Sequence, residues 1–131
     1  MRTLLLGLLA TTALALHAQD QEWQTLGDAQ YLCGGVGEES MATLQSQRGN
    51  ATHSLLFVAG ARGAYVADVD VSISGKALAQ PLQFKADGPI CLLKLPKGSY
   101  TLEASHGGLQ KTQKLGNSKQ TVLKWPDEPA A

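Results

Sequence analysis

The 131-residue chain is poor in aromatic residues, in cysteine and in excess charge of either sign. Aromatic residues make up 5% of it, and Lys plus Arg balance Asp plus Glu at 11 each. The lysines are not interleaved with arginine or aromatic side chains, so the sequence does not indicate nucleic-acid binding. The metal-site spacings Cys-x-x-Cys and His-x-x-x-His and the G-x-S-x-G motif of serine hydrolases are missing. We therefore expect no cofactor, no metal site and no catalytic centre.

The one long apolar run lies at the N-terminus, where Arg2 precedes TLLLGLLATTALAL. A short apolar stretch with a basic residue before it and small residues after it is typical of a secretory signal peptide. It is shorter than the roughly 20 residues that cross a membrane, so we do not expect an integral membrane protein. We expect cleavage after Ala18, with Ala15 as the alternative site. A periplasmic location follows, with full secretion as the alternative.

The remaining chain is long enough for one domain with a single modest core. After the signal peptide at 1–18, we expect a loose polar lead at 19–30, a folded domain at 31–126 and a tail at 127–131. Trp23 is the one apolar anchor of the lead. The sequence therefore predicts a single small folded unit.

Basic and acidic residues are distributed unevenly. Residues 19–75 hold seven acidic side chains against two arginines, whereas residues 76–131 hold eight lysines against four acidic side chains. Such asymmetry can provide a surface for anionic partners such as lipid phosphates. Because the lysines are scattered singly among the predicted strands, we interpret them as solvated side chains that keep strand edges from pairing with other chains.

Cys33 and Cys91 are the only two cysteines. In an oxidising compartment an even number of cysteines favours a disulfide, which would stabilise the fold by about 2 to 5 kcal/mol. The alternative is two buried thiols that behave as small apolar residues.

One segment has a helical pattern and the rest alternates as strands do. EESMATLQSQRG carries acidic residues in its first turn and Gly49–Asn50 as a stop, which predicts a helix over about 38–48. From His53 onward apolar residues recur at every second position. In one expected strand, Tyr65 and Val69 face the core while Asp68 faces solvent. We expect strands at 53–59, 63–74, 78–84, 90–95, 99–106, 109–115 and 119–125.

Short strands separated by turn residues predict the fold class. Asp-Gly-Pro, Pro-Lys-Gly and Gly-Gly supply the backbone angles of tight turns. This layout is typical of an all-β protein rather than of parallel strands with crossover helices. We expect a mainly β protein, an antiparallel β-sandwich of about seven strands with one short N-terminal helix.

The segment LPKGSYTLEAS, residues 95–105, resembles the turn and strand of carboxypeptidase regulatory-like domains, small sandwiches of the transthyretin (prealbumin-like) type. Together with GGVGEES, YVADVDVSI, DGP and LKWP, it is similar to a group of small secreted proteobacterial proteins over residues 31–126. The resemblance implies that Tyr100, Leu102 and Ala104 face inward. It brings no catalytic residues, and the Tyr-Arg-Gly-Ser tail of transthyretin-type hydrolases is replaced by WPDEPAA.

The glycine-rich stretch YLCGGVGEES could be a phosphate loop or only a turn. A P-loop requires G-x-x-x-x-G-K-[ST], but the lysine is missing, and Glu38 and Glu39 would repel an anion. We interpret Gly34, Gly35 and Gly37 as a sharp strand-to-helix turn, with the two carboxylates stabilising the start of the helix. A divalent cation or a cationic partner at the glutamates is the alternative.

Asp68 and Asp70 form a second acidic pair on one expected strand. Paired carboxylates can bind Ca²⁺ or perform acid and base catalysis, but alternation alone places both on the solvent face. We keep the glycine loop, its glutamates and these two aspartates as a possible surface site.

The sequence indicates only a broad class of function. The sequence predicts a non-enzymatic binding or structural module of the cell envelope, acting through its sheet surface or glycine loop on an unknown envelope component, protein or polysaccharide. The alternative is a small-molecule or metal-binding accessory protein. A hydrolase of the transthyretin-like type is the third hypothesis.

Overall fold

The computed structural model describes residues 22–115 and 120–126, so the predicted signal peptide and tail lie outside the described residues. The helix α1 spans Glu38–Gln47 and is followed by a short 3₁₀ helix, Arg48–Asn50. The described strands are β1 Gln24–Leu26, β2 Ala29–Gly34, β3 His53–Ala59, β4 Ala64–Tyr65, β5 Val69–Ser74, β6 Leu82–Ala86, β7 Ile90–Lys94, β8 Tyr100–His106, β9 Leu109–Leu115 and β10 Gln120–Trp125. No helix in these two segments is long and apolar enough to cross a membrane.

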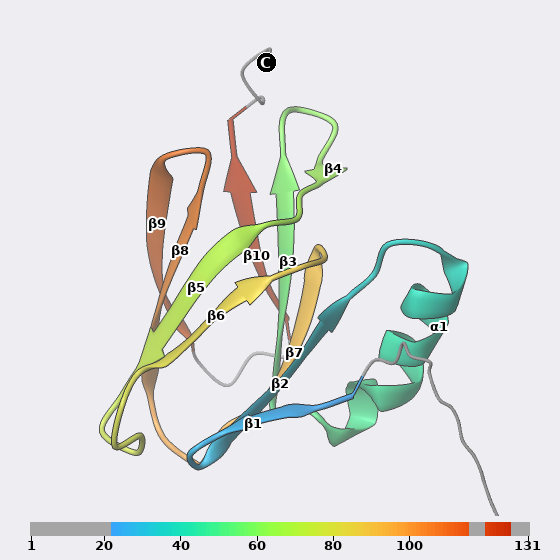
Figure 1. Ribbon diagram of the computed structural model, residues 1–131. Helices are drawn as coiled ribbons and strands as arrows, with labels where there is room; N and C mark the ends of the chain where they lie inside the picture. The colour runs from blue at the N-terminus through green and yellow to red at the C-terminus, as the bar shows by residue number, and fades with distance from the viewer. Residues whose placement is uncertain (1–21, 116–119, 127–131) are drawn as a thin grey trace, which may run out of the picture.

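The strands form two sheets that face each other, with α1 on the outer side of one of them (Figure 1). The first sheet has the order β1-β2-β7-β3-β10, with β4 paired to the end of β3, and the second has the order β6-β5-β8-β9. The chain is therefore mainly β with one α-helix in its described part, as predicted.

One strand pair departs from the antiparallel expectation. β10 lies beside β3 in parallel register, with Gln120 opposite Ser54 and Trp125 opposite Ala59. Two strands that are joined by a tight hairpin are antiparallel. No hairpin joins β3 to β10, because β10 does not follow β3 in the chain. It follows β9, which belongs to the other sheet, and it starts at the same end of the molecule as β3 (Figure 1).

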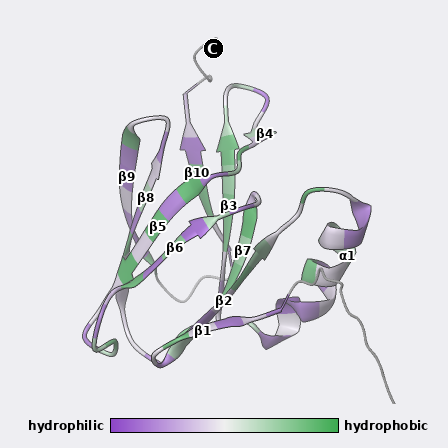
Figure 2. Cartoon of the chain, viewed as in Figure 1, coloured by the Kyte–Doolittle hydropathy of each residue, from purple (hydrophilic) through white to green (hydrophobic). Residues whose placement is uncertain are grey.

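The main core lies between the two sheets. Phe57 and Leu93 enter it from the first sheet and Ile73 and Leu102 from the second, each with no measurable exposure. Figure 2 shows apolar residues recurring along the strands of both sheets. Period-two alternation produces this arrangement, because every second side chain of a strand points to the same face.

Tyr100, Leu102 and Ala104 are all buried in this core. Their inward orientation agrees with what the resemblance implied for β8. The intervening Glu103 is exposed on the opposite face of the strand.

A second, smaller core lies on the outer side of the first sheet. Leu44 of α1 packs there against Leu32 and Leu92, which lie opposite each other on β2 and β7. Trp23 packs against the same cluster, and its Nε1 donates a hydrogen bond to Gln47 Oε1 at 3.1 Å. The helix is therefore held by one buried leucine and by the N-terminal segment.

The N-terminal lead is more ordered than its polar composition predicted. Residues 24–26 pair with residues 29–31 as the β1–β2 hairpin. All three β1 side chains are exposed. Because backbone pairing with β2 holds this strand, rather than side-chain burial, hydrophobic periodicity does not reveal it.

The single strand expected at 63–74 is wrong: it is divided between the two sheets. β4 pairs with β3, β5 pairs with β6 and β8, and the chain crosses between the sheets at residues 66–68. Asp68 has φ 60, the only positive value of a non-glycine residue in the described segments. The crossing reverses the alternation, so Tyr65 is exposed and Val66 is buried.

The strand expected at 78–84 begins later. β6 starts at Leu82 because the preceding residues form a turn, in which the Leu78 N–H donates to the Gly75 carbonyl at 3.1 Å. The strands β3, β7, β8, β9 and β10 agree with their predicted positions to within about a residue at each end. No strand bounds were predicted for β1 or for β2, although β2 lies in the middle of the first sheet.

The disulfide between Cys33 and Cys91 is confirmed. The two residues lie directly opposite each other on β2 and β7, and their Cα atoms are 4.1 Å apart. The bridge joins positions 58 residues apart in the sequence and so ties the glycine loop to the centre of the first sheet.

Candidate functional site

The glycine loop turns the chain from β2 into α1. Gly35 and Gly37 have φ values of 108 and 92, which favour glycine. The Gly35 N–H donates to Ser40 Oγ at 2.8 Å, so this backbone donor is used within the loop. Glu38 and Glu39 are exposed in the first turn of α1, where carboxylates complement the helix dipole.

Gly88, in the loop before β7, lies very close to the end of β2. A Cβ added to Gly88 would collide with the backbone of Gly34, including its carbonyl oxygen. The loop before β7 thus packs directly on the end of β2. This close contact accounts for the glycine at position 88, whereas the positive φ values account for Gly35 and Gly37.

Asp68 and Asp70, which were expected on one face of a single strand, lie in different parts of the structure. Asp70 is on β5, where its Oδ1 lies 3.8 Å from Lys85 Nζ on β6, and both side chains are more than half exposed. Such a surface ion pair contributes about 0 to 1 kcal/mol. Asp68 lies in the crossing between sheets instead. No group of three or more His, Cys, Asp or Glu in the described part of the chain could hold a metal ion.

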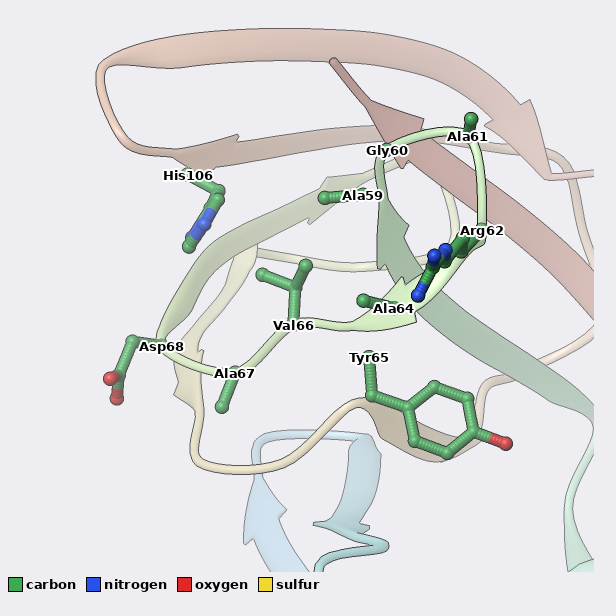
Figure 3. Close-up of a pocket in the computed structure, with 10 residues that line it drawn as sticks. All are labelled: Ala59, Gly60, Ala61, Arg62, Ala64, Tyr65, Val66, Ala67, Asp68 and His106. Atoms are coloured by element: carbon green, nitrogen blue, oxygen red, sulfur yellow. The ribbon is translucent and has the colours of Figure 1, made fainter. Parts of the chain in front are cut away.

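Asp68 lines an open hollow of about 670 Å³ that the sequence did not reveal. The hollow lies at the end of the molecule that carries the β3–β4 and β8–β9 turns (Figure 1). We call it the alanine hollow, because Ala59, Ala64 and Ala67 line it together with Val66 (Figure 3). The glycine loop and its glutamates are not part of it.

Four larger side chains surround this small-residue lining. Figure 3 shows Asp68 and His106 on one side of the alanine hollow and Arg62 and Tyr65 on the other. Arg62 is exposed, and Tyr65 is 61% exposed. The hollow therefore offers a cation and an anion on opposite sides of an apolar surface.

Trp125 fixes the segments that form the alanine hollow. Its side chain is buried, and its Nε1 donates to the Leu109 carbonyl at 3.0 Å. Its own carbonyl accepts the Gly60 N–H at 3.0 Å, and its ring lies edge-on to His106 with centroids 5.8 Å apart. One aromatic residue on β10 thus connects the β3–β4 turn to the β8–β9 turn.

The backbone of the crossing is held by the two sheets. The Val66 N–H donates to the Phe57 carbonyl at 3.0 Å, and the Asp68 N–H donates to the Ala86 carbonyl at 2.8 Å. These bonds hold Asp68 in its left-handed conformation, which costs free energy in residues other than glycine. Because these N–H groups are already bonded, the side chains are what this part of the hollow offers to a ligand.

Comparisons of the chain with protein-family models, with curated proteins and with solved structures find no match in any of the three. We therefore infer a function from the geometry of this molecule.

Sequence reasoning missed Arg62, Tyr65 and His106 as site residues. Arg62 and His106 are 44 positions apart, and no motif links them. The one local signal is the turn Gly60–Gly63, whose glycines mark a loop without saying what faces it.

Proposed function

We propose that the protein is a non-enzymatic binding module of the bacterial cell envelope, exported to the periplasm and acting on an envelope component through the alanine hollow. The observation that carries this proposal is the composition of the hollow: an apolar lining of small side chains flanked by Arg62 on one side and Asp68 on the other.

The chemistry of these groups suits a short peptide or a sugar acid. The planar guanidinium of Arg62 can hold a carboxylate through two parallel hydrogen bonds. Asp68 accepts hydrogen bonds from amine or hydroxyl groups, and Tyr65 provides aromatic surface. Alanine side chains let the ligand backbone approach closely. The expected ligand therefore carries a carboxylate at one end and hydroxyl or amine groups at the other.

The fold assigned in this proposal is a carboxypeptidase regulatory-like β-sandwich of the prealbumin type. Two facing sheets that bury the main core between them support it. The LPKGSY turn supports it further, because the Tyr100 hydroxyl at the start of β8 donates to the Pro96 carbonyl, which holds the turn against the strand. The disulfide supports export, since such bonds persist in oxidising compartments.

A double substitution with a matched control tests the hollow. R62Q/D68N removes one positive and one negative charge from the alanine hollow. K85Q/D70N removes the same charges from the exposed ion pair on β5 and β6. Each variant would carry a photo-crosslinking amino acid at Ala61, an exposed residue that lines the hollow, and be expressed in a strain that lacks the wild-type gene.

We expect the parent and K85Q/D70N to crosslink to the same envelope component and to complement the deletion. R62Q/D68N should do neither while keeping the melting temperature of the parent. Equal crosslinking and complementation by both double variants would refute a role for the hollow.

A further inference from the structure

A second hollow, at the opposite end of the second sheet, collects lysines that are far apart in the sequence. Lys76, Lys97 and Lys114 line an open space of about 700 Å³ together with hydroxyl groups of serine and threonine. We call it the lysine hollow. These three lysines stand singly in the sequence, but three separate segments of the fold bring them to the same hollow.

Strand register places one side of the lysine hollow. Ser74 on β5 lies opposite Thr101 on β8, and Thr101 lies opposite Lys114 on β9. The neighbouring residues Ile73 and Leu102 point into the core. Ser74, Thr101 and Lys114 therefore form one row across the outer face of the second sheet.

A close contact between two loops positions the other side of the lysine hollow. Lys76 follows Gly75 in the β5–β6 connection, and Lys97 lies in the β7–β8 connection. A Cβ on Gly75 would lie 2.5 Å from the Ser99 carbonyl oxygen and 2.6 Å from Tyr100 Cδ1. The two loops can approach this closely only because residue 75 has no side chain, so the loop that carries Lys76 stays beside the loop that carries Lys97.

No acidic residue lines the lysine hollow among the described residues. Glu103, two positions beyond Thr101 on the same face of β8, lines a different hollow with Asp70. Three ammonium groups without a carboxylate between them create a positive potential, and an anion bound there would relieve their mutual repulsion.

We propose that the lysine hollow binds a phosphate monoester or inorganic phosphate. A phosphate monoester carries close to two negative charges on three terminal oxygens, which matches three lysines that approach from different segments. A single carboxylate has two oxygens and one charge. The hydroxyl groups of Ser74, Ser99 and Thr101 supply further donors at the same place.

Two probes distinguish a free ligand from a lipid headgroup. Inorganic phosphate is titrated into the purified protein at constant ionic strength, with sodium chloride as the reference, and backbone amide NMR shifts are recorded. Vesicles of phosphatidylcholine containing phosphatidic acid, a phosphate monoester, are compared in cosedimentation with vesicles containing phosphatidylglycerol, a diester. Binding to either phosphate probe supports the site, and the probe that binds identifies the source.

Three sets of variants locate the binding. K76Q/K97Q/K114Q should lose roughly 100-fold in affinity, since each lysine near an anionic group contributes about a factor of five. K76R/K97R/K114R should retain binding. K85Q/K111Q/K124Q removes the same charge from lysines outside the hollow and should bind as the parent does.

Two results would overturn the proposal. One is that neither phosphate probe binds better than its reference. The other is that K85Q/K111Q/K124Q loses as much affinity as K76Q/K97Q/K114Q, because binding would then follow total charge. R62Q/D68N should keep phosphate binding, so this test is independent of the alanine hollow.

Discussion

Removing the disulfide should destabilise the protein by an amount that follows from its position in the chain. The bond joins residues 58 positions apart. The loop-closure model gives about 3 kcal/mol for a 15-residue loop and about 4.7 for 100 residues, so a loop of this size corresponds to about 4 kcal/mol. Cys91 is fully buried and Cys33 half-buried, so alanine is the appropriate replacement at both positions. We expect C33A/C91A to lose about 4 kcal/mol.

The folded state should survive this substitution. The bridged positions are directly opposed on β2 and β7, and backbone pairing between these strands continues on both sides of the bond. Most of the loss should therefore come from the greater freedom of the unfolded chain.

Guanidinium unfolding measures this free energy. The oxidised parent is compared with C33A/C91A, and both are repeated with reductant. Reductant should lower the stability of the parent toward that of the variant and leave the variant unchanged. A two-state loss below about 1 kcal/mol would refute the reasoning that the bridge restrains the unfolded chain.

Three further predictions concern single positions. Replacing Glu38 and Glu39 by glutamine should cost about 0.3 to 1 kcal/mol each, because the carboxylates lie in the first turn of α1, and the loss should shrink in high salt during chemical unfolding. Asp68→Ala should be about 1 to 2 kcal/mol less stable than Asp68→Gly, because φ is positive there; equal melting temperatures would contradict this strain. Burial raises the pKa of Tyr100 above its ordinary value. Its contribution to stability is therefore complete below the pKa of an unfolded tyrosine, about 10, and is lost as pH rises beyond it; Tyr100→Phe should flatten this part of the stability profile.

Features that depend on neighbouring residues could be predicted from the sequence. The acidic first turn and the Gly49–Asn50 stop indicate the helix at 38–48, and the structure has it at Glu38–Gln47. Alternation gave the bounds of β3 and β9, because side chains point alternately to the two faces of any strand. The disulfide was predictable for a different reason: with only two cysteines, a single pairing exists.

Features that depend on sheet partners could not be predicted. The alternating run at 63–74 looks continuous, yet Asp68 reverses its phase, because β4 and β5 bond to strands of different sheets. The parallel pairing of β10 with β3 likewise reflects a change of sheet rather than any residue of β10.

Both candidate sites belong to this second group. Arg62 reaches the alanine hollow with His106 because Trp125 connects their two turns, and the lysine hollow exists because Gly75 lets two loops touch. Periodicity and turn signals report what lies within a few residues along the chain. Which distant segments become neighbours is determined by how the two sheets bury their common core, and only the tertiary structure contains that information.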